Sequence, residues 1–427
     1  MIKKPFFSLG SPKLGYQVIA ASEKDSVQKI PLPSEVTLLF ELHQIPNEAL
    51  KIRPGDEVKT GQKLKLTDEE DESLISTATG KIQEICDFTG YLNRPCTSII
   101  IKTTEDIIDD GFSKANETVS AESTLEFLSS LPGDSSFSSI INPDSPLYTI
   151  VINGIDKDLM VTANQHIVGT ETEDLKKGID CLRRITNPNN VVIAVPPNLV
   201  SKAEGLGAEV QVIQPIYPNG LPEMIMQNVM EKTVPEGENC EDLGVGFVNA
   251  ETVAALGSAY NKGQIPVNKT LTVIKSDGSS INIKARIGTP VKAVLDALDI
   301  TTASGDRLVF GGPMTGTAIY SEDMPILPDT DAIMVQDSSQ IVRCADTPCV
   351  NCGECVRACP ANVPVNMLIR LLENGLYEEA VDQYDLLSCI ECGLCAYVCS
   401  ARIPVFHYIM LGKYEFDRIK SAEESNV

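Results

Sequence analysis

Two runs of four cysteines near the C-terminal end constrain this chain more than any other feature. They read Cys349-Val-Asn-Cys352-Gly-Glu-Cys355-Val-Arg-Ala-Cys359 and Cys389-Ile-Glu-Cys392-Gly-Leu-Cys395-Ala-Tyr-Val-Cys399. Both runs have the spacing Cys-x2-Cys-x2-Cys-x3-Cys, which is the ligand spacing of [4Fe–4S] clusters. Nine of the 13 cysteines fall between Cys344 and Cys399, so the chain is not a disulfide scaffold. The runs predict two [4Fe–4S] clusters.

The fourth cysteine of each run is expected to reach the other cluster, because two-cluster ferredoxins have crossed ligand sets. The predicted sets are Cys349, Cys352, Cys355 and Cys399 for the first cluster, and Cys389, Cys392, Cys395 and Cys359 for the second. Zinc is the alternative for Cys-x2-Cys pairs, but runs of four with an x3 step fit iron–sulfur better. Gly353 and Gly393 permit the tight turn around a cluster. Cys344 breaks the spacing and is not a predicted ligand.

Charge and hydropathy exclude several function classes. The 427 residues predict two to four domains. The net charge of −24 is opposite to that of surfaces that bind phosphate backbones, so no nucleic-acid partner is expected. Apolar stretches such as 191–195 are far shorter than the roughly 18 residues that a membrane span needs. The first residues lack an apolar signal core. We therefore expect neither a signal peptide nor a transmembrane segment.

The segment between the two runs predicts a helical hairpin. Apolar residues recur at helical spacing from Val365 to Leu372, and Asn374-Gly375 closes that helix. A second amphipathic face follows from Tyr377 to Tyr384. We interpret both faces as packing surfaces.

The sequence before the cysteine runs predicts several small domains. Short strand pairs with glycine turns over 52–64 and 76–82 are typical of a barrel-sandwich, here a scaffold because no Met-Lys-Met carrier tip is present. Ten serines between Ser113 and Ser145 indicate a linker. Strands over 147–153, 191–195 and 208–214 with a helix over 173–186 predict a parallel α/β domain. A hairpin from Thr270 and a helix over 291–298 predict a β-grasp-like module.

The predicted fold class is therefore multidomain α+β. Its predicted parts are a barrel-sandwich scaffold over 1–105, a Ser-rich linker over 106–147, a parallel α/β domain over 148–265, a β-grasp-like module over 266–340 and a helical two-cluster ferredoxin domain over 341–427.

The order of these parts resembles the C subunits of Rnf electron-transport complexes. The resemblance is carried by Pro54-Gly55-Asp56, Gly61-Gln62, Tyr217-Pro218-Asn219-Gly220, Asn249-Ala250-Glu251-Thr252, Ile287-Gly288-Thr289-Pro290, Gly311-Gly312-Pro313-Met314-Thr315-Gly316 and both cysteine runs. It implies a peripheral subunit on the cytoplasmic face of a prokaryotic ion-pumping complex, with the other Rnf subunits and a soluble ferredoxin as partners. The α/β domain then resembles the NADH- and FMN-binding subunit of respiratory complex I.

One departure from this family bears on its nucleotide cofactors. The family carries a loop of the form Gly-Gly-x-Gly-Phe-Pro-Thr before the first α/β strand, whereas residues 112–150 contain only Gly133. Backbone N–H groups approach a phosphate closely only where side chains are absent. Asp156 and Asp158 stand where the family has glutamates, and they are expected to add negative charge beside Asn153. The departure predicts that the FMN and NADH sites are lost.

The function that these features favour is electron transfer within a complex rather than stand-alone catalysis, and no catalytic residue is predicted. Electrons would pass from ferredoxin through the two clusters, and the terminal electron acceptor of the complex would be a quinone-like carrier or a cytochrome. The alternatives are a working NADH:ferredoxin subunit with a divergent flavin site, an adaptor whose clusters only brace the fold, and a cobalamin-reductase relative. The last would be expected to keep the glycine-rich loop.

Overall fold

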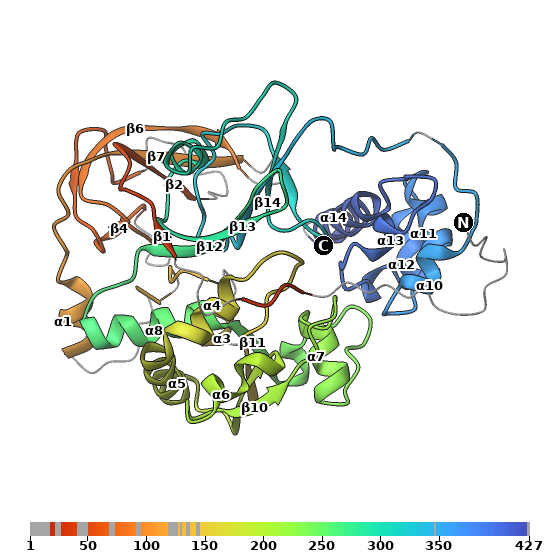
Figure 1. Cartoon of the computed structure of the whole chain (residues 1–427), viewed down its shortest axis with the longest axis horizontal. Coiled ribbons are helices and arrows are strands. Elements are labelled where there is room, and N and C mark those ends of the chain that lie inside the picture. The colour runs from red at the N-terminus through yellow and green to blue at the C-terminus, as the bar shows by residue number, and fades with distance from the viewer. Residues whose placement is uncertain are drawn as a thin grey trace. The chain divides into compact units, whose positions relative to one another are not determined.

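The computed structural model describes residues 18–21, 27–40, 50–67, 73–90, 95–117, 127–128, 130–133, 137–141, 146–345 and 347–424. The chain divides into two compact units (Figure 1). The larger unit contains Val18–Pro215 and Cys240–Ser339, and the smaller unit contains Ile216–Asn239 and Gln340–Val427. All strands of the described part lie in the larger unit, whereas both cysteine runs lie in the smaller one.

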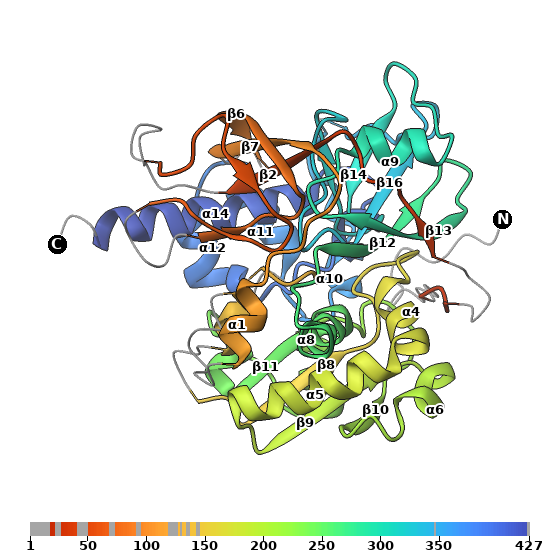
Figure 2. The ribbon, with the colours of Figure 1, turned by 90° about the vertical axis from the view of Figure 1, so that its left-hand side faces the viewer.

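The first part of the larger unit is an antiparallel sheet of order β2-β7-β6-β3 with a separate β4-β5 pair. Figure 2 shows β2, β7 and β6 of this sheet. The strands are β2 (Glu35–Phe40), β3 (Glu57–Val58), β4 (Lys63–Lys65), β5 (Ser73–Ile75), β6 (Gly80–Thr89) and β7 (Pro95–Thr103). Alternate residues of β2 point inward, because Val36 and Leu38 are buried beside Ile99 and Ile101 of β7. This alternation gives the sheet one apolar face.

The second part is a parallel sheet of order β10-β9-β8-β11. Its elements are β8 (Thr149–Asn153), α4 (Ala163–Thr170), α5 (Thr172–Thr186), β9 (Asn190–Val195), α6 (Val200–Ala203), β10 (Glu209–Val212), β11 (Val245–Asn249) and α8 (Ala250–Lys262). Strand β9 is β-branched and buried along nearly its whole length, as expected for a parallel strand covered on both faces. Helix α5 buries Leu175, Ile179 and Leu182 at helical spacing.

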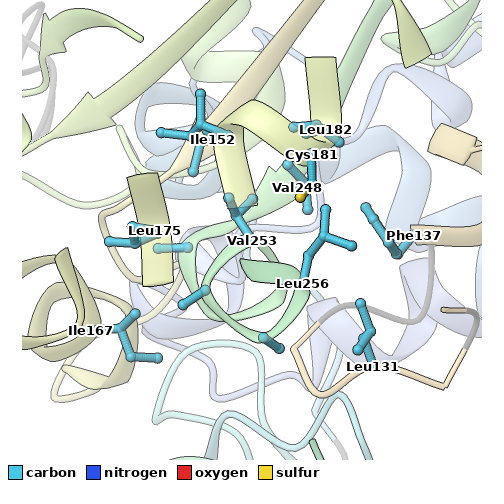
Figure 3. Close-up of a cluster of buried hydrophobic side chains, with 14 of the residues drawn as sticks. Leu131, Phe137, Ile152, Ile167, Leu175, Cys181, Leu182, Val248, Val253 and Leu256 are labelled. Atoms are coloured by element: carbon cyan, nitrogen blue, oxygen red, sulfur yellow. The ribbon is translucent and has the colours of Figure 1, made fainter. Parts of the chain in front are cut away.

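The predicted Ser-rich linker over 106–147 contributes to the core of this α/β part. The described stretch includes α1 (Gly111–Glu117) and α3 (Phe137–Ile141). Phe112, Leu131 and Phe137 are each 1 % exposed and belong to one cluster with Leu175 of α5 and Leu256 of α8. Figure 3 shows Leu131, Phe137, Leu175 and Leu256 of this cluster. The described apolar residues of this stretch therefore belong to the α/β core, although the serine content is typical of a connector.

The third part is a mixed sheet of order β1-β13-β12-β16-β14-β15. Its elements are β1 (Gln28–Lys29), β12 (Asn268–Ile274), β13 (Ser280–Arg286), α9 (Val291–Ala297), β14 (Arg307–Phe310), β15 (Thr317–Ile319) and β16 (Ala332–Gln336). The hairpin of β12 and β13 and the helix after it lie where the sequence predicted them. Buried residues of α9, including Val291 and Leu295, pack against this sheet.

The smaller unit is helical. It contains α7 (Pro222–Val229), α10 (Glu354–Ala358), α11 (Val365–Leu372), α12 (Tyr377–Tyr384), α13 (Leu394–Tyr397) and α14 (Val405–Glu424). Helices α11 and α12 form the predicted hairpin, and Leu368, Leu372 and Ala380 lie in its core. Within the described ranges, no helix combines the length and the apolar character that crossing a bilayer requires.

Residues 216–239 differ from the expected organisation. The sequence placed them inside the α/β domain of 148–265, but they belong to the compact unit that carries the cysteine runs. Tyr217 explains part of this placement, because its hydroxyl donates a hydrogen bond of 2.5 Å to the carbonyl of Cys392. A contact between residues 175 positions apart leaves no local signal in the sequence.

Candidate metal centre

The two cysteine loops have the same backbone conformation. Gly353 and Gly393 have φ of +75° and +71°, and each directly precedes a short helix, α10 or α13. Asn351 and Glu391, at matching positions between the first two cysteines, are also left-handed, with φ of 54° and 55°. Each loop therefore turns twice before its third cysteine, which allows three thiols to face one point.

The match extends beyond the loops and amounts to an internal repeat that the sequence analysis missed. An offset of 40 residues relates Cys349 to Cys389 and relates Val363-Pro364-Val365 to Ile403-Pro404-Val405. The helices that follow, α11 and α14, begin at Val365 and Val405. The sequence carries a signal for this repeat. In both copies an aliphatic residue, Pro and Val begin four positions after the fourth cysteine.

The first group of thiols comes from both runs. One cavity is lined by Cys349, Cys352, Cys355 and Cys399. Ile369, Ile403 and Val405 contribute apolar walls to it. Burial raises the pKa of the Cys355 thiol to about 11, and the charges of the three other thiolates of this set act in the same direction. The crossed set predicted for the first cluster is thus gathered at one place.

The second group also draws on both runs. Burial raises the pKa of Cys392 to about 12, and charges on Cys389 and Cys359 add to this rise. The pKa of Cys395 is raised by burial and then by the same neighbours together with Cys392. Cys359 belongs to the first run, so this group matches the second predicted set. Cys344 is exposed and does not line the cavity of the first group.

These donor sets fit the predicted cofactor. A [4Fe–4S] cluster takes four thiolates, and each group supplies four sulfur atoms in a setting with apolar walls. Four thiolates at one place repel one another, so a set of this kind needs a cation to compensate its charges, and iron would supply that charge.

Polar side chains hold the second loop from outside. Lys413 of α14 donates hydrogen bonds of 2.7 Å to the carbonyl of Cys389 and to the carboxylate of Glu391. Tyr217, which is 4 % exposed, holds the carbonyl of Cys392. On the first loop, Arg357 donates to the carbonyl of Cys352 at 3.3 Å. The cysteine spacing gives no indication of these three contacts.

The α/β part has its own candidate crevice. Ligands of open parallel sheets bind beyond the carboxyl ends of the strands, where the strand order reverses. In this sheet that point lies between β8 and β11, whose last residues, Asn153 and Asn249, are paired. Asn249 caps α8 by accepting hydrogen bonds of 2.8 Å from the backbone N–H and the hydroxyl of Thr252. A Cβ atom at Gly133 would lie 2.2 Å from the Thr252 hydroxyl, so this loop covers the cap.

The two aspartates beside the crevice have partners within the protein. Asp156 accepts hydrogen bonds from the backbone N–H of Asn164 at 2.9 Å and from the Gln165 amide at 3.1 Å. Burial raises its pKa to about 6. The negative charge expected beside Asn153 is therefore held, at Asp156, by hydrogen-bond donors of the chain itself.

Asp158 is held by the Gly311–Gly316 loop. Its carboxylate accepts hydrogen bonds from the backbone N–H groups of Met314 and Thr315 and from the Thr315 hydroxyl, at 3.1, 2.9 and 2.7 Å. A Cβ atom at Gly312 would lie 2.5 Å from the Asp158 carboxyl carbon. The Gly-Gly-Pro-Met-Thr-Gly motif thus cradles an anion that belongs to the chain itself.

A buried ion pair joins the start of α8 to β12. Lys269 is fully buried and contacts the Glu251 carboxylate, and its Nζ lies 3.4 Å from Asp331. Burial alone would lower the pKa of Lys269, but the charges of Glu251 and Asp331 outweigh it and raise the pKa. Glu251 also accepts a hydrogen bond of 2.6 Å from the backbone N–H of Thr270. These contacts fill the space beside the α8 N-terminus with protein groups.

Two family models match parts of the chain. Residues 136–258 match the Nuo51 FMN-binding domain, and residues 348–403 match the 4Fe-4S dicluster domain. The first match contains all four strands of the parallel sheet, and the second contains both cysteine runs. The mixed α/β fold thus includes a domain of the FMN-binding type and a C-terminal dicluster domain.

Relatives match over more of the chain. The C subunit of the proton-translocating ferredoxin:NAD(+) oxidoreductase complex of Clostridium ljungdahlii is 26% identical over 85% of this chain and 84% of its own length. The C subunit of the ion-translocating oxidoreductase complex of Rhodobacter capsulatus is 26% identical over 51% of this chain, which spans only 44% of that relative. An NAD+-reducing [NiFe]-hydrogenase structure aligns over 71% of this chain and 65% of its own, with a TM-score of 0.46 and 12% identity.

The names of these relatives, together with the FMN-type and dicluster matches, confirm the resemblance drawn from the motifs quoted above. The chain is a relative of the C subunits of Rnf-type ion-translocating oxidoreductase complexes.

Proposed function

We propose that this chain is a peripheral electron-transfer subunit of an Rnf-type complex and carries two [4Fe–4S] clusters. The observation that supports this most is the cavity lined by three thiols of the first run and one of the second. The crossed grouping is the arrangement that two-cluster ferredoxins use to keep their clusters close. When bound, such clusters supply one-electron transfer.

The residues of the chain would hold and shield the two clusters. Cys349, Cys352, Cys355 and Cys399 would hold the first, and Cys389, Cys392, Cys395 and Cys359 the second. The apolar side chains of Ile369, Ile403 and Val405 would shield the first cluster from water on one side. Shielding of this kind and hydrogen bonds near the sulfurs are what a protein uses to set a cluster potential.

Tyr217→Phe tests the bracing of the second loop. The change leaves the buried carbonyl of Cys392 without its phenol donor, which costs about 1–3 kcal/mol. We expect faster loss of iron from the second cluster when the anaerobic protein is incubated with a chelator. Tyr414→Phe is the control, because Tyr414 is 58% exposed on α14. Equal rates of iron loss in the two variants would contradict the bracing role.

We propose further that the α/β part has lost its FMN and NADH sites. Gly133 lies against the Asn249 cap, so the α8 N-terminus is covered where a phosphate could otherwise approach its N–H groups. The backbone donors of Met314 and Thr315 are engaged by Asp158. An incoming phosphate would have to displace these internal acceptors. In this proposal the terminal electron acceptor of the complex is a quinone-like carrier or a cytochrome.

The cofactor content of the anaerobically purified chain tests both proposals. We expect about eight iron and eight sulfide per chain, because two clusters of four each are predicted. We expect no acid-extractable flavin and no bleaching of the cluster absorbance by NADH. Reduced ferredoxin should reduce at least one cluster under the same conditions. A protein with both clusters that ferredoxin does not reduce would instead favour an adaptor.

A second candidate function is a working NADH:ferredoxin oxidoreductase subunit. It is favoured by the match of residues 136–258 to the FMN-binding family and by the name of the clostridial relative, which couples ferredoxin with NAD(+). Stoichiometric FMN, together with rapid reduction by NADH, would establish it.

The partners and the remaining domains follow from the same proposal. The relatives are named as one subunit of a complex, which supports the other Rnf subunits as partners. The location proposed with them is the cytoplasmic face of the cell membrane. The antiparallel order β2-β7-β6-β3 supports a barrel-sandwich over 1–105. The pair β12-β13 followed by α9 supports a β-grasp-like module over 266–340.

A further inference from the structure

The second cysteine loop carries an ion pair that the first loop lacks at the matching position. The Nζ atom of Lys413 lies 2.7 Å from the carbonyl of Cys389 and 2.7 Å from the Glu391 carboxylate. The 40-residue repeat relates Glu391 to Asn351, a neutral residue whose amide oxygen accepts a hydrogen bond from Asn366. The two loops share a backbone but differ in charge here.

Both charged groups stand close to the proposed cluster. Glu391 lies within the loop, between Cys389 and Cys392, and the Lys413 side chain is only 19% exposed. The Lys413 ammonium is held against the backbone carbonyl of Cys389, the first predicted ligand of this loop. The positive charge therefore lies next to the predicted cluster site.

The surroundings of the second loop strengthen such fields. Cys392 and Cys395 are buried, whereas their counterparts in the first loop, Cys352 and Cys355, are half-buried. Charges interact more strongly where burial excludes water. Lys413 and Glu391 also line a polar cavity of about 410 Å³, so water screens part of their effect. A moderate effect is therefore expected.

We propose that Lys413 and Glu391 are opposing tuning residues for the reduction potential of the second cluster. Reduction adds one negative charge to the cluster, so the ammonium favours the reduced form and the carboxylate favours the oxidised form. The pair thereby sets how electrons distribute between the two clusters. The inference rests on the proposed function, because it requires the second cluster to be present.

The test is a redox titration of the full chain followed by electron paramagnetic resonance. The second cluster is identified as the signal missing from Cys392→Ala. Lys413→Met should shift its equilibrium about tenfold toward the oxidised form, which equals 59 mV for one electron. Glu391→Gln should shift it the opposite way, and the double variant should return near the wild-type value. The signal of the first cluster should not move.

Two matched variants separate charge from structure. Lys413→Arg keeps the positive charge and should keep the potential, and Lys420→Met removes an exposed charge two turns further along α14. Shifts in the same direction for Lys413→Met and Glu391→Gln, or no shift in either, would overturn the inference. If Lys413→Met loses the second cluster, Glu391→Gln alone decides. The inference then requires that the reduction potential of the second cluster rises in Glu391→Gln. A wild-type chain without a second cluster would instead refute the proposed function.

Discussion

Cys359→Ala is expected to remove the cluster of the second run, and Cys399→Ala is expected to remove that of the first. The charges that raise the pKa of Cys395 include that of Cys359, and those that raise the pKa of Cys355 include that of Cys399. Each alanine therefore takes away one thiolate of the other loop's set. A cluster that loses one of four ligands loses most of its binding free energy.

The measurement is iron and sulfide content together with the paramagnetic resonance signal of each cluster. Each variant should keep about four iron atoms per chain, and the two remaining signals should differ. Cys344→Ser is the matched control, since Cys344 is exposed and outside both groups, and it should keep both clusters. If each substitution removed only the cluster of its own run, the crossed assignment would be wrong.

Lys269→Met is expected to destabilise the larger unit by about 3–5 kcal/mol. The substitution leaves Glu251 buried and without its cation, and the charged form of that carboxylate is costly in such a site. Burial already raises the pKa of Glu251 even with Lys269 beside it. The remaining hydrogen bond from Thr270 cannot replace the lost charge.

The free energy of unfolding in urea, followed by circular dichroism, measures this effect. The double variant Glu251→Gln with Lys269→Met should recover much of the loss, because it removes the uncompensated charge. Lys292→Met is the control, as Lys292 is exposed at the start of α9. A loss below about 1 kcal/mol for Lys269→Met would show that the pair does not hold α8 to β12.

Local patterns were predictable from the sequence. The helix expected over 173–186 is α5, Thr172–Thr186, and the strand expected over 191–195 is β9, Asn190–Val195. Helical and strand periodicities depend on neighbours a few residues apart, so the chain itself encodes them. The cysteine spacing is equally local, and it predicted the turn conformations at Gly353 and Gly393.

Contacts between distant segments were decided by the tertiary structure alone. Nothing near Tyr217 indicates that residues 216–239 join the unit of the cysteine runs, since the contact with Cys392 spans 175 residues. Lys269 looks like a surface residue of a strand until Glu251 and Asp331 are brought beside it. Phe112 and Phe137 read as parts of a serine-rich connector until the α/β core surrounds them. Burial and charge pairing depend on which segments meet, and a periodicity of a few residues carries no information about that.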